Sequence, residues 1–469
     1  MRRNFTTVTL LIIVSLVLAA CGGQSATSTP AVNSATATPE ITTTAVQPTS
    51  TKLPDISVDT NALKGLQIQF MHPWSGETAK RMAALIDEFN QTNEWRIHVI
   101  AQMPGSAGML ATTLNDDLAT GNQPAMAAAP VDVLLGLNRN GSAIADLNPY
   151  IYSQKWGMTP EDLGDLDPEF MAQDAVQGFQ YGVPAERTAV MMFYNVTWAK
   201  ELGFSSPPSS SLEFQSQSCT ANQAMKKDTD STNDGLGGWI VNTDGLVTYS
   251  WLINLNANVF ESGIYTFDSP AVQKAFKFTH DLFTSGCAWI PRAQTPYDYF
   301  ANRQTLVYSG YLQDILPQQF AMTLAGSKDE WKPIPFPSDG TQRELVQGPS
   351  YAILKTTPEK QLASWLFIRW LTDPARQASM VQTSMTLPLS GNVKDQLLNS
   401  SSMPQLWKDA VNALSAPTAV PSDPNWSIAR TVLEDAGWQL FKTNLADKDI
   451  PTLLEQMDAT IAELEGQNP

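Results

Sequence analysis

The stretch Tyr181–Asn195 reads YGVPAERTAVMMFYN, and the rest of the chain is interpreted outward from it. Its apolar run, Val190–Tyr194, is typical of a strand buried on both faces. Before that run, Gly182 and Pro184 favour turning or extended backbone. Glu186 and Arg187 lie between the turn and the strand. Two interpretations are open: a surface connection carrying a solvated ion pair, or a strand that crosses between two lobes and presents polar groups to a cleft.

Length and charge limit the choice of protein class. With 469 residues the chain is too long for a single hydrophobic core, so two or three domains are expected. The formal net charge is -17, and loss of Arg2 and Arg3 with a cleaved leader would lower it to -19. Nucleic acids and anionic lipids require a cationic surface, so neither is expected as a ligand.

The N-terminus has the pattern of a secretory signal over residues 1–20. Arg2 and Arg3 precede an apolar run, Val8–Leu18, which is too short for a membrane span. The signal ends in Leu18-Ala19-Ala20-Cys21, which resembles the bacterial lipobox, whose cysteine is lipidated and becomes the mature N-terminus. Ordinary cleavage after Ala20, with Cys21 unmodified, is the alternative. The expected location is the outer face of the cell membrane.

Residues 21–63 are expected to form a disordered tether. Beyond Cys21 they are mostly Ser, Thr, Ala, Pro and Gln and hold too little apolar surface to offset the entropy of an ordered chain. About 40 such residues have an r.m.s. reach on the order of 35 Å.

Two cysteines remain after Cys21, namely Cys219 and Cys287. In an exported protein an even number of cysteines favours a disulfide. The alternative is a pair of free, buried thiols.

The segment after the tether has the pattern of an open α/β lobe. Leu66, Ile68 and Phe70 alternate with polar residues, as in a half-buried strand. An amphipathic helix and a second strand follow, which together form the βαβ unit of a parallel sheet. The apolar run Val131–Leu135 is predicted to be the next buried strand.

Polar and aromatic side chains follow the first of these strands. His72, Trp74 and Glu77 lie at its carboxyl end, where open parallel sheets bind ligands. An aromatic ring and a carboxylate suit a polyhydroxylated ligand, because the ring contacts sugar C–H groups and the carboxylate accepts hydroxyl protons. The structural alternatives are lobe packing for Trp74, stabilisation of the helix dipole for Glu77 and a hydrogen-bonded structural role for His72.

Signatures of enzymes are weak in this sequence. HExxH, GxSxG and Walker motifs are absent, and three histidines supply few ligands for a metal centre. A secreted glycoside hydrolase acting through two carboxylates is the main enzymatic alternative. The acidic segment Asp228–Asp234 is interpreted as a turn, because an EF-hand loop would need a Glu where Val241 stands. A calcium site in this segment is the alternative. No catalytic residue, cofactor or metal is assigned.

Several motifs, in this order, resemble the bacterial extracellular solute-binding proteins of carbohydrate ABC importers, the family that includes the maltose- and glycerol-phosphate-binding proteins. They are the lipobox, HPWSG at 72–76, YGVP and FYN in the opening stretch, KELGF at 200–204, FDSPAVQKAF at 267–276 and SWLFIRWLTDPARQ at 364–377. The resemblance implies a type II periplasmic-binding-protein fold: two α/β lobes joined by hinge strands, with the sugar held in a central cleft.

The resemblance also implies boundaries and contacts. Lobe 1 would comprise 64–187 plus 305–368, and lobe 2 would comprise 188–304 plus 369–469. The crossings would lie near Glu186–Val190, near Leu306–Gly310 and around Phe367. The ligand-binding residues implied by matching position are Trp74, Glu77, Glu186, Arg187, Trp239, Trp251, Tyr308, Gly310, Tyr311, Gly348, Ser350 and Tyr351. For each tyrosine and for most of the tryptophans, core packing is the alternative.

The sequence therefore predicts a monomeric, lipid-anchored binding protein that captures a sugar or related solute by lobe closure and passes it to a membrane permease. The sugar itself is left open, because the segment Ser384–Pro388 departs from the family pattern at a place that often touches ligand. A binding protein that signals to a membrane sensor is the alternative within the same fold, since lobe closure is the output in both cases.

Overall fold

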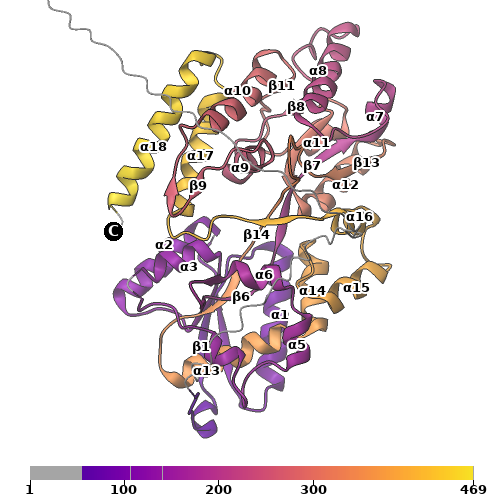
Figure 1. The fold of residues 1–469 in the computed structure, drawn as a ribbon. Coiled ribbons are helices and arrows are strands. Elements are labelled where there is room, and N and C mark those ends of the chain that lie inside the picture. The colour runs from indigo at the N-terminus through magenta and orange to yellow at the C-terminus, as the bar shows by residue number, and fades with distance from the viewer. Residues whose placement is uncertain (1–54, 106, 140, 468–469) are drawn as a thin grey trace, which may run out of the picture. The chain divides into compact units, whose positions relative to one another are not determined.

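The computed structural model describes residues 55–105, 107–139 and 141–467. Cys21 and the predicted signal lie outside these residues. The described chain folds around two large sheets, each with its own helices (Figure 1). None of the described helices combines the length and the apolar character that a membrane span requires.

The first sheet has five strands in the order β2-β1-β3-β15-β6. β1 pairs in parallel with β2 and β3, while β15 is antiparallel to β3 and β6. Ile68 and Phe70 alternate inward on β1, as predicted for a half-buried strand. The strands are β1 (Gln67–Met71), β2 (His98–Gln102), β3 (Met126–Ala129), β6 (Val183–Pro184) and β15 (Ser350–Ile353).

Helices cover this sheet. They are η1 (Thr60–Leu63), α1 (Gly76–Thr92), α2 (Ala107–Thr120), α3 (Val131–Leu137), α4 (Asn148–Ile151), α5 (Pro160–Asp165), α6 (Pro168–Gln173), α13 (Pro358–Leu371) and α14 (Pro374–Ser384). The strand predicted at Val131–Leu135 is wrong, because these residues form α3. The preceding Met126–Ala129, short and fully buried, is the strand, and Pro130 separates the two elements.

The second sheet has seven strands in the order β11-β8-β12-β7-β14-β16, with β13 also pairing with β7. β7 (Thr188–Asn195) is buried along its whole length, which confirms the strand predicted from the opening stretch. The others are β8 (Trp239–Ile240), β11 (Ala288–Trp289), β12 (Val307–Tyr311), β13 (Trp331–Ile334), β14 (Glu344–Gln347) and β16 (Pro417–Ala419). Two small hairpins are β4 (Ala175–Val176) with β5 (Phe179–Gln180) and β9 (Phe260–Glu261) with β10 (Ile264–Tyr265).

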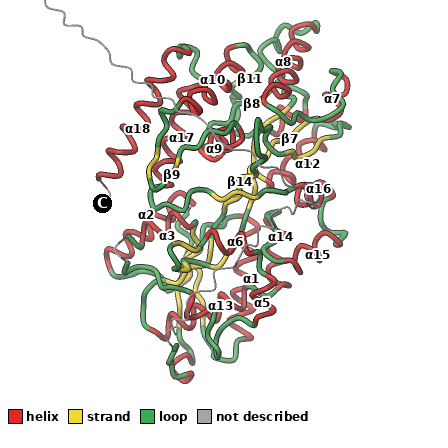
Figure 2. Tube along the Cα trace, in the orientation of Figure 1, coloured by secondary structure: helices red, strands yellow, loops and turns green. Residues whose placement is uncertain are grey.

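The helices of the second lobe, drawn in red in Figure 2, come from the middle and the end of the chain. They are α7 (Val196–Glu201), α8 (Ser211–Lys227), α9 (Gly245–Asn254), α10 (Pro270–Thr284), α11 (Tyr297–Ala301), η2 (Leu312–Asp314), α12 (Ile315–Leu324), α16 (Gln405–Ala413), α17 (Trp426–Leu440), η3 (Asp447–Asp449) and α18 (Ile450–Gln467). The remaining helix, α15 (Gly391–Asn399), packs against α14.

The positions of the crossings differ in part from the expected ones. The first runs from β6 to β7 through Ala185–Arg187, close to its expected position. The second runs from β14 to β15 through Gly348 and Pro349, because β12 pairs antiparallel with β7 and stays in the second sheet. The third follows α14, where the Leu387 N–H donates to the Arg187 carbonyl at 2.7 Å.

These crossings bear on the expected lobe division. Within 305–368, which was assigned to lobe 1, β12, β13 and β14 join the second sheet, and β15 joins the first. Within 369–469, assigned to lobe 2, α14 packs against α1 of the first lobe. The expected tether also ends before residue 63, because Leu63 is fully buried and Ile56 and Val58 pack on the first core.

The predicted disulfide is present. Cys219 on α8 is bonded to Cys287, which immediately precedes β11. Both residues belong to or pack on the main hydrophobic cluster of the second lobe. The bond therefore joins a helix to a sheet edge within one lobe.

Candidate functional site

The two lobes meet where β6 continues into β7 and β14 continues into β15. Position 348 requires a glycine because the two crossing segments approach each other closely: a Cβ at Gly348 would lie 2.0 Å from the Glu186 carbonyl oxygen. The Ala185 and Glu186 N–H groups both donate to the Pro349 carbonyl, at 3.0 and 3.1 Å. The first two crossings therefore run side by side.

A buried ion pair lies beneath these crossings. Arg187 is 1% exposed and donates from Nη2 to Asp174 Oδ2 at 3.0 Å and to Ser350 Oγ at 3.1 Å. Its Nη1 donates to the carbonyls of residues 186, 348 and 349. The Ser350 hydroxyl donates to the same Asp174 oxygen at 2.6 Å. Arg187 and Ser350, both expected as ligand contacts, thus bind the crossings to each other and to the segment after α6.

Trp74, Glu186 and Tyr351 form a second group at the same junction, called the hinge cluster below. Trp74 Nε1 donates to Glu186 Oε2 at 2.9 Å, and the Trp74 ring meets Tyr351 edge-on at 6.1 Å between centroids. Trp74 follows β1, Glu186 lies on the first crossing and Tyr351 lies on β15. The structure therefore brings together three of the predicted residues from distant parts of the sequence.

The hinge cluster borders a small cavity that α14 and the third crossing close. Glu186 and Tyr351 line it together with Leu371, Met380, Val381 and Leu387. Burial beside these apolar groups raises the pKa of Glu186 to about 7, although the Trp74 N–H and the Arg187 guanidinium oppose the shift. Glu186 is thus a carboxyl group that exchanges its proton near neutral pH.

His72 and Glu77 have different surroundings. His72 is 2% exposed, its ring lies 5.2 Å from that of Trp74, and burial lowers its pKa to about 4. Glu77 is exposed in the first turn of α1 and pairs with Lys80 at 2.6 Å. The position of Glu77 agrees with the structural alternative of a residue that stabilises the helix dipole.

The predicted residues on β12 divide between core and surface. Tyr308 is 1% exposed and stacks on Phe193 at 4.7 Å. At Gly310 a Cβ would lie 2.3 Å from Asp314 Oδ2 and would clash with that side chain, whereas a glycine fits without a clash. Tyr311 is half-buried at the end of the strand, and burial together with a hydrogen bond to Asp244 raises its pKa well above the ordinary value.

Trp239 and Trp251 lie in the core of the second lobe. Trp239 is 1% exposed and Trp251 is 3% exposed. Their rings lie 5.5 Å apart and both meet Phe214 edge-on. Trp239 Nε1 donates to Ser309 Oγ at 3.1 Å. The structure places both in packing positions, which is the alternative that the sequence left open.

Charged residues that the sequence did not single out also lie near the junction of the lobes. Burial raises the pKa of Asp132, at the start of α3, and the Arg430 guanidinium on α17 opposes this. Arg430 acts in the same direction on Tyr311. Asp132 follows Pro130 at the carboxyl end of β3, and this position after a parallel strand was the signal that could have identified it.

A larger pocket of about 670 Å³ opens at the carboxyl ends of β8 and β11. Its polar lining includes Asn242, Asp244, Ser309 and the exposed acids Glu434 and Asp435. Trp438 is 55% exposed at its edge. The second lobe therefore has a wide pocket with a mixed polar and apolar lining, unlike the narrow cavity at the hinge cluster.

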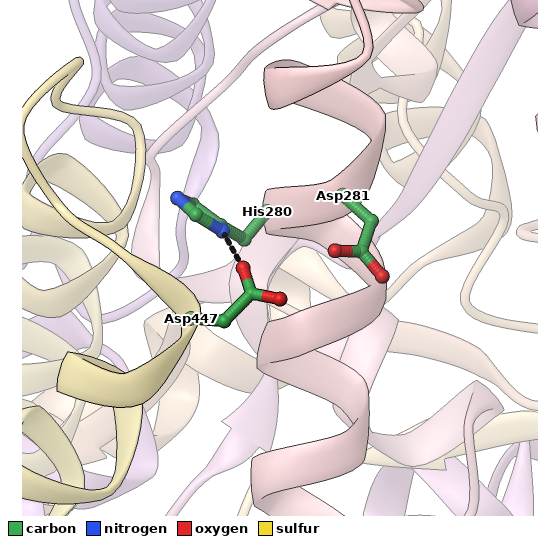
Figure 3. A group of neighbouring side chains, drawn as sticks. All are labelled: His280, Asp281 and Asp447. Carbon is green, nitrogen blue, oxygen red and sulfur yellow. Dashed lines mark hydrogen bonds and ion pairs between the residues drawn. The ribbon is translucent and has the colours of Figure 1, made fainter.

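One group of described residues has metal-ligand geometry: His280 and Asp281 on α10 with Asp447 on η3, all with ligand atoms within 4.8 Å of one another (Figure 3). His280 Nδ1 lies 3.0 Å from Asp447 Oδ1. Lys277 pairs with Asp281 at 2.8 Å and also with Asp447. The Lys277 ammonium group thus already forms ion pairs with both carboxylates, and the cluster is best described as an ion-pair network.

The acidic segment Asp228–Asp234 is a turn that uses its own side chains. Asp228 Oδ1 accepts the Asp230 N–H at 2.7 Å, and Asp230 Oδ1 accepts the Thr232 N–H at 3.0 Å. These contacts agree with the turn predicted from the sequence.

Solved structures share this fold. MalE, the sugar-binding protein of Xanthomonas citri, superposes with a TM-score of 0.70 at 19% identity, covering 85% of this chain and 98% of MalE. UgpB from Mycobacterium tuberculosis, in complex with glycerophosphocholine, gives 0.68 at 16% identity, covering 85% of this chain and 99% of UgpB. The cyclic α-maltosyl-1,6-maltose binding protein of Arthrobacter globiformis gives 0.66 at 17% identity, covering 85% and 99%. These likenesses confirm the predicted two-lobed α/β fold.

The sequence itself matches the family model described as bacterial extracellular solute-binding protein over residues 84–416. No curated protein matches the sequence. The family match covers most of the chain and confirms the prediction of an extracytoplasmic binding protein rather than an enzyme. The protein belongs to the bacterial extracellular solute-binding proteins.

Proposed function

We propose that this protein is the substrate-binding component of an ABC importer and that it captures a sugar or a related polyhydroxylated solute between its lobes. Structurally similar proteins include sugar-binding proteins and one protein in complex with glycerophosphocholine. Sugars and glycerophosphocholine are all small solutes that carry hydroxyl groups. Family membership supports solute capture, and the similar structures support this ligand class.

The hinge cluster is the observation that carries the proposal. It lies at the carboxyl end of β1 and at the crossings, so a solute that touches it also lies beside the second lobe. An indole presents an apolar face to sugar C–H groups, and a carboxyl group that is near its pKa can donate to or accept from a hydroxyl. Opposite it, Tyr311, Asp244 and Arg430 would supply the contacts of the second lobe.

The remaining predicted residues take graded roles in this proposal. Glu77 would lie at the margin of the site. The ion pair of Arg187, with Ser350 and Gly348, would hold the crossings in place, while Tyr308 and Gly310 would form the wall behind Tyr311. Trp239 and Trp251 would act only through packing. Capture then needs no chemistry, because a solute that contacts both lobes favours the closed state by its differential affinity.

Attachment and delivery complete the proposal. A lipid on Cys21 would hold the protein at the outer face of the membrane, and the segment up to residue 55 would let the monomeric body reach the permease. Intact-mass measurement of the protein extracted from membranes should show a diacylated or triacylated cysteine. An unmodified N-terminus would remove the anchoring part of the proposal only.

The direct test is thermal unfolding of the full-length protein with mono- and oligosaccharides, polyols and glycerol phosphodiesters. A ligand present at 100 times its Kd should stabilise the protein by about 2.7 kcal/mol and raise the midpoint. The ligand should be recovered unchanged. Consumption of the compound, or no shift across the whole panel, would contradict the proposed function.

A further inference from the structure

A contact between the lobes lies away from the crossings, at the end of α3 and the start of α17 (Figure 1). Arg139, just after α3, donates from Nη2 to the Asn425 side-chain oxygen and to the Pro424 carbonyl, the latter at 3.4 Å. Gly136 comes close as well, since a Cβ there would lie 3.7 Å from the Pro424 oxygen. The end of α3 in the first lobe thus contacts the loop before α17 in the second lobe.

Each side of this contact is fixed within its own lobe. In the first lobe, Asn138 Oδ1 accepts the N–H groups of Ala143 and Ile144 at 3.1 and 3.0 Å, which holds the chain that follows α3. Arg139 therefore directly follows a residue, Asn138, whose side chain is hydrogen-bonded within the first lobe.

In the second lobe, Tyr265 donates to Asp423 Oδ1 at 3.2 Å, and the same oxygen accepts the Asn425 N–H at 2.9 Å. Asn425 Nδ2 donates to Glu465 on α18 at 3.3 Å. The loop is therefore anchored to β10 and to the C-terminal helix. A contact made by Asn425 thus connects the first lobe to these elements of the second lobe and not only to a loop.

Charge adds to the contact. Asp132 is 7% exposed at the start of α3, and the Arg430 guanidinium on α17 favours its ionised form across the same interface. Arg430 therefore acts on an acid of opposite charge across the interface, and Arg139 donates to a carbonyl oxygen and an amide oxygen there.

We infer that an interlobe latch holds the lobes together before ligand arrives. The latch consists of the contacts of Arg139 with Asn425 and Pro424, and the attraction between Asp132 and Arg430 supports it. The crossings allow the lobes to rotate about one side, and the latch joins them at a second place, so it resists that rotation. The effect on affinity rests on the proposed function: a larger closed fraction in the free protein lowers the apparent Kd.

The test begins with the full-length protein free of ligand. Arg139→Gln, Asn425→Ala and the double variant are compared with Arg81→Gln, which removes an exposed arginine from α1 of the same lobe. Amide hydrogen exchange in 423–430 and 131–138 is measured together with the radius of gyration from small-angle scattering. Both Arg139 and Arg81 are exposed, so the variants should fold.

We expect Arg139→Gln to speed exchange in both segments by about fivefold or more and to enlarge the radius of gyration, with Arg81→Gln unchanged. The double variant should open the lobes little more than either single variant, because each single change already removes the Arg139–Asn425 contact that the two residues share. Exchange and radius equal to those of the unaltered protein would overturn the latch.

The affinity arm separates this inference from the function. If a sugar from the panel binds, Arg139→Gln should weaken it about three- to tenfold. If no sugar binds but the free variant opens, the latch stands and the proposed ligand class fails. If a sugar binds all variants equally and exchange is unchanged, the function stands and the latch fails.

Discussion

The hinge cluster and the tryptophan pair of the second lobe contain the same kind of side chain in opposite settings. Trp74 gives its N–H to a titratable carboxyl group beside a cavity and two chain crossings. Trp239 gives its N–H to a serine, and Trp251 is enclosed by aromatic rings. All three indoles are buried, so burial does not separate them. The comparison teaches that the position of an aromatic residue relative to the strand ends and crossings, rather than its burial, distinguishes the indole of the proposed site from the indoles of the core.

The largest effect should come from removing an indole of the second lobe. Trp251→Ala leaves a cavity among Phe214, Trp239 and Phe336 and should lower the free energy of unfolding by about 3–5 kcal/mol in urea titrations. Ligand affinity measured well below the unfolding midpoint should be unchanged. A drop in affinity without a drop in stability would make Trp251 a ligand contact and break the comparison.

Breaking the disulfide should have the next largest effect, again on stability alone. The bond closes a loop over a sequence separation of 68 within the lobe that holds the tryptophan pair. Replacing Cys219 and Cys287 together by serine should cost about 2–4 kcal/mol in the free energy of unfolding. Isothermal titration with the identified ligand should give the same Kd as before. A large rise in Kd would mean that this lobe transmits its stability to the site.

Trp74→Ala should weaken binding in addition to lowering stability, because this indole is buried as well. We expect the Kd to rise at least tenfold, or about 1.4 kcal/mol, because the stacking surface and the N–H to Glu186 are both lost. Trp370→Ala is the matched control: it removes an indole from a different pocket of the first lobe. Equal affinities for both variants and the unaltered protein would remove the hinge cluster from the site.

The smallest effect is a pH dependence that belongs to the hinge cluster alone. The pKa of Glu186 rises from 4.5 to about 7 on folding, so the folded protein binds a proton that the unfolded chain has released. This contribution to stability is full below pH 4.5 and is lost as the pH rises through 7. Relative to Glu186→Gln, the unaltered protein should lose about 1 kcal/mol between pH 5 and pH 6. Glu77→Gln, at an exposed site, should follow the unaltered protein; a pH-independent difference for Glu186→Gln would sink the assignment.

Much of the architecture could be predicted because periodicity and capping residues act locally. The alternation of β1 and the apolar run of β7 gave the right elements, and α10 begins with Ser269 as its N-cap and Pro270 in its first turn, a pair that is common at helix starts. The run 131–135 was misjudged because an apolar pattern of that length fits a strand or a buried helix equally well.

The site was predictable only in part, since its geometry depends on pairings far apart in the sequence. Asp174 gives no local sign that it will meet Arg187 and Ser350 beneath the crossings. Nor does the sequence show that Arg430 acts on Asp132 across the lobes. Whether Trp239 is a core or a site residue depends on which way β8 faces, and a two-residue strand has no measurable alternation.

The order of strands in the first sheet has a consequence for how the protein is made. β15 lies between β3 and β6, although residues 188–347 of the chain, with six strands of the other sheet, intervene in the sequence. A chain exported from its N-terminus therefore cannot complete the first sheet until residue 353 has crossed the membrane. Contacts of such long sequence separation form slowly, so β3 exposes an unpaired edge until β15 arrives, and the second lobe still lacks β16, α17 and α18 at that point. That edge is where a chaperone outside the cytoplasm would be needed, and where premature pairing would trap the chain.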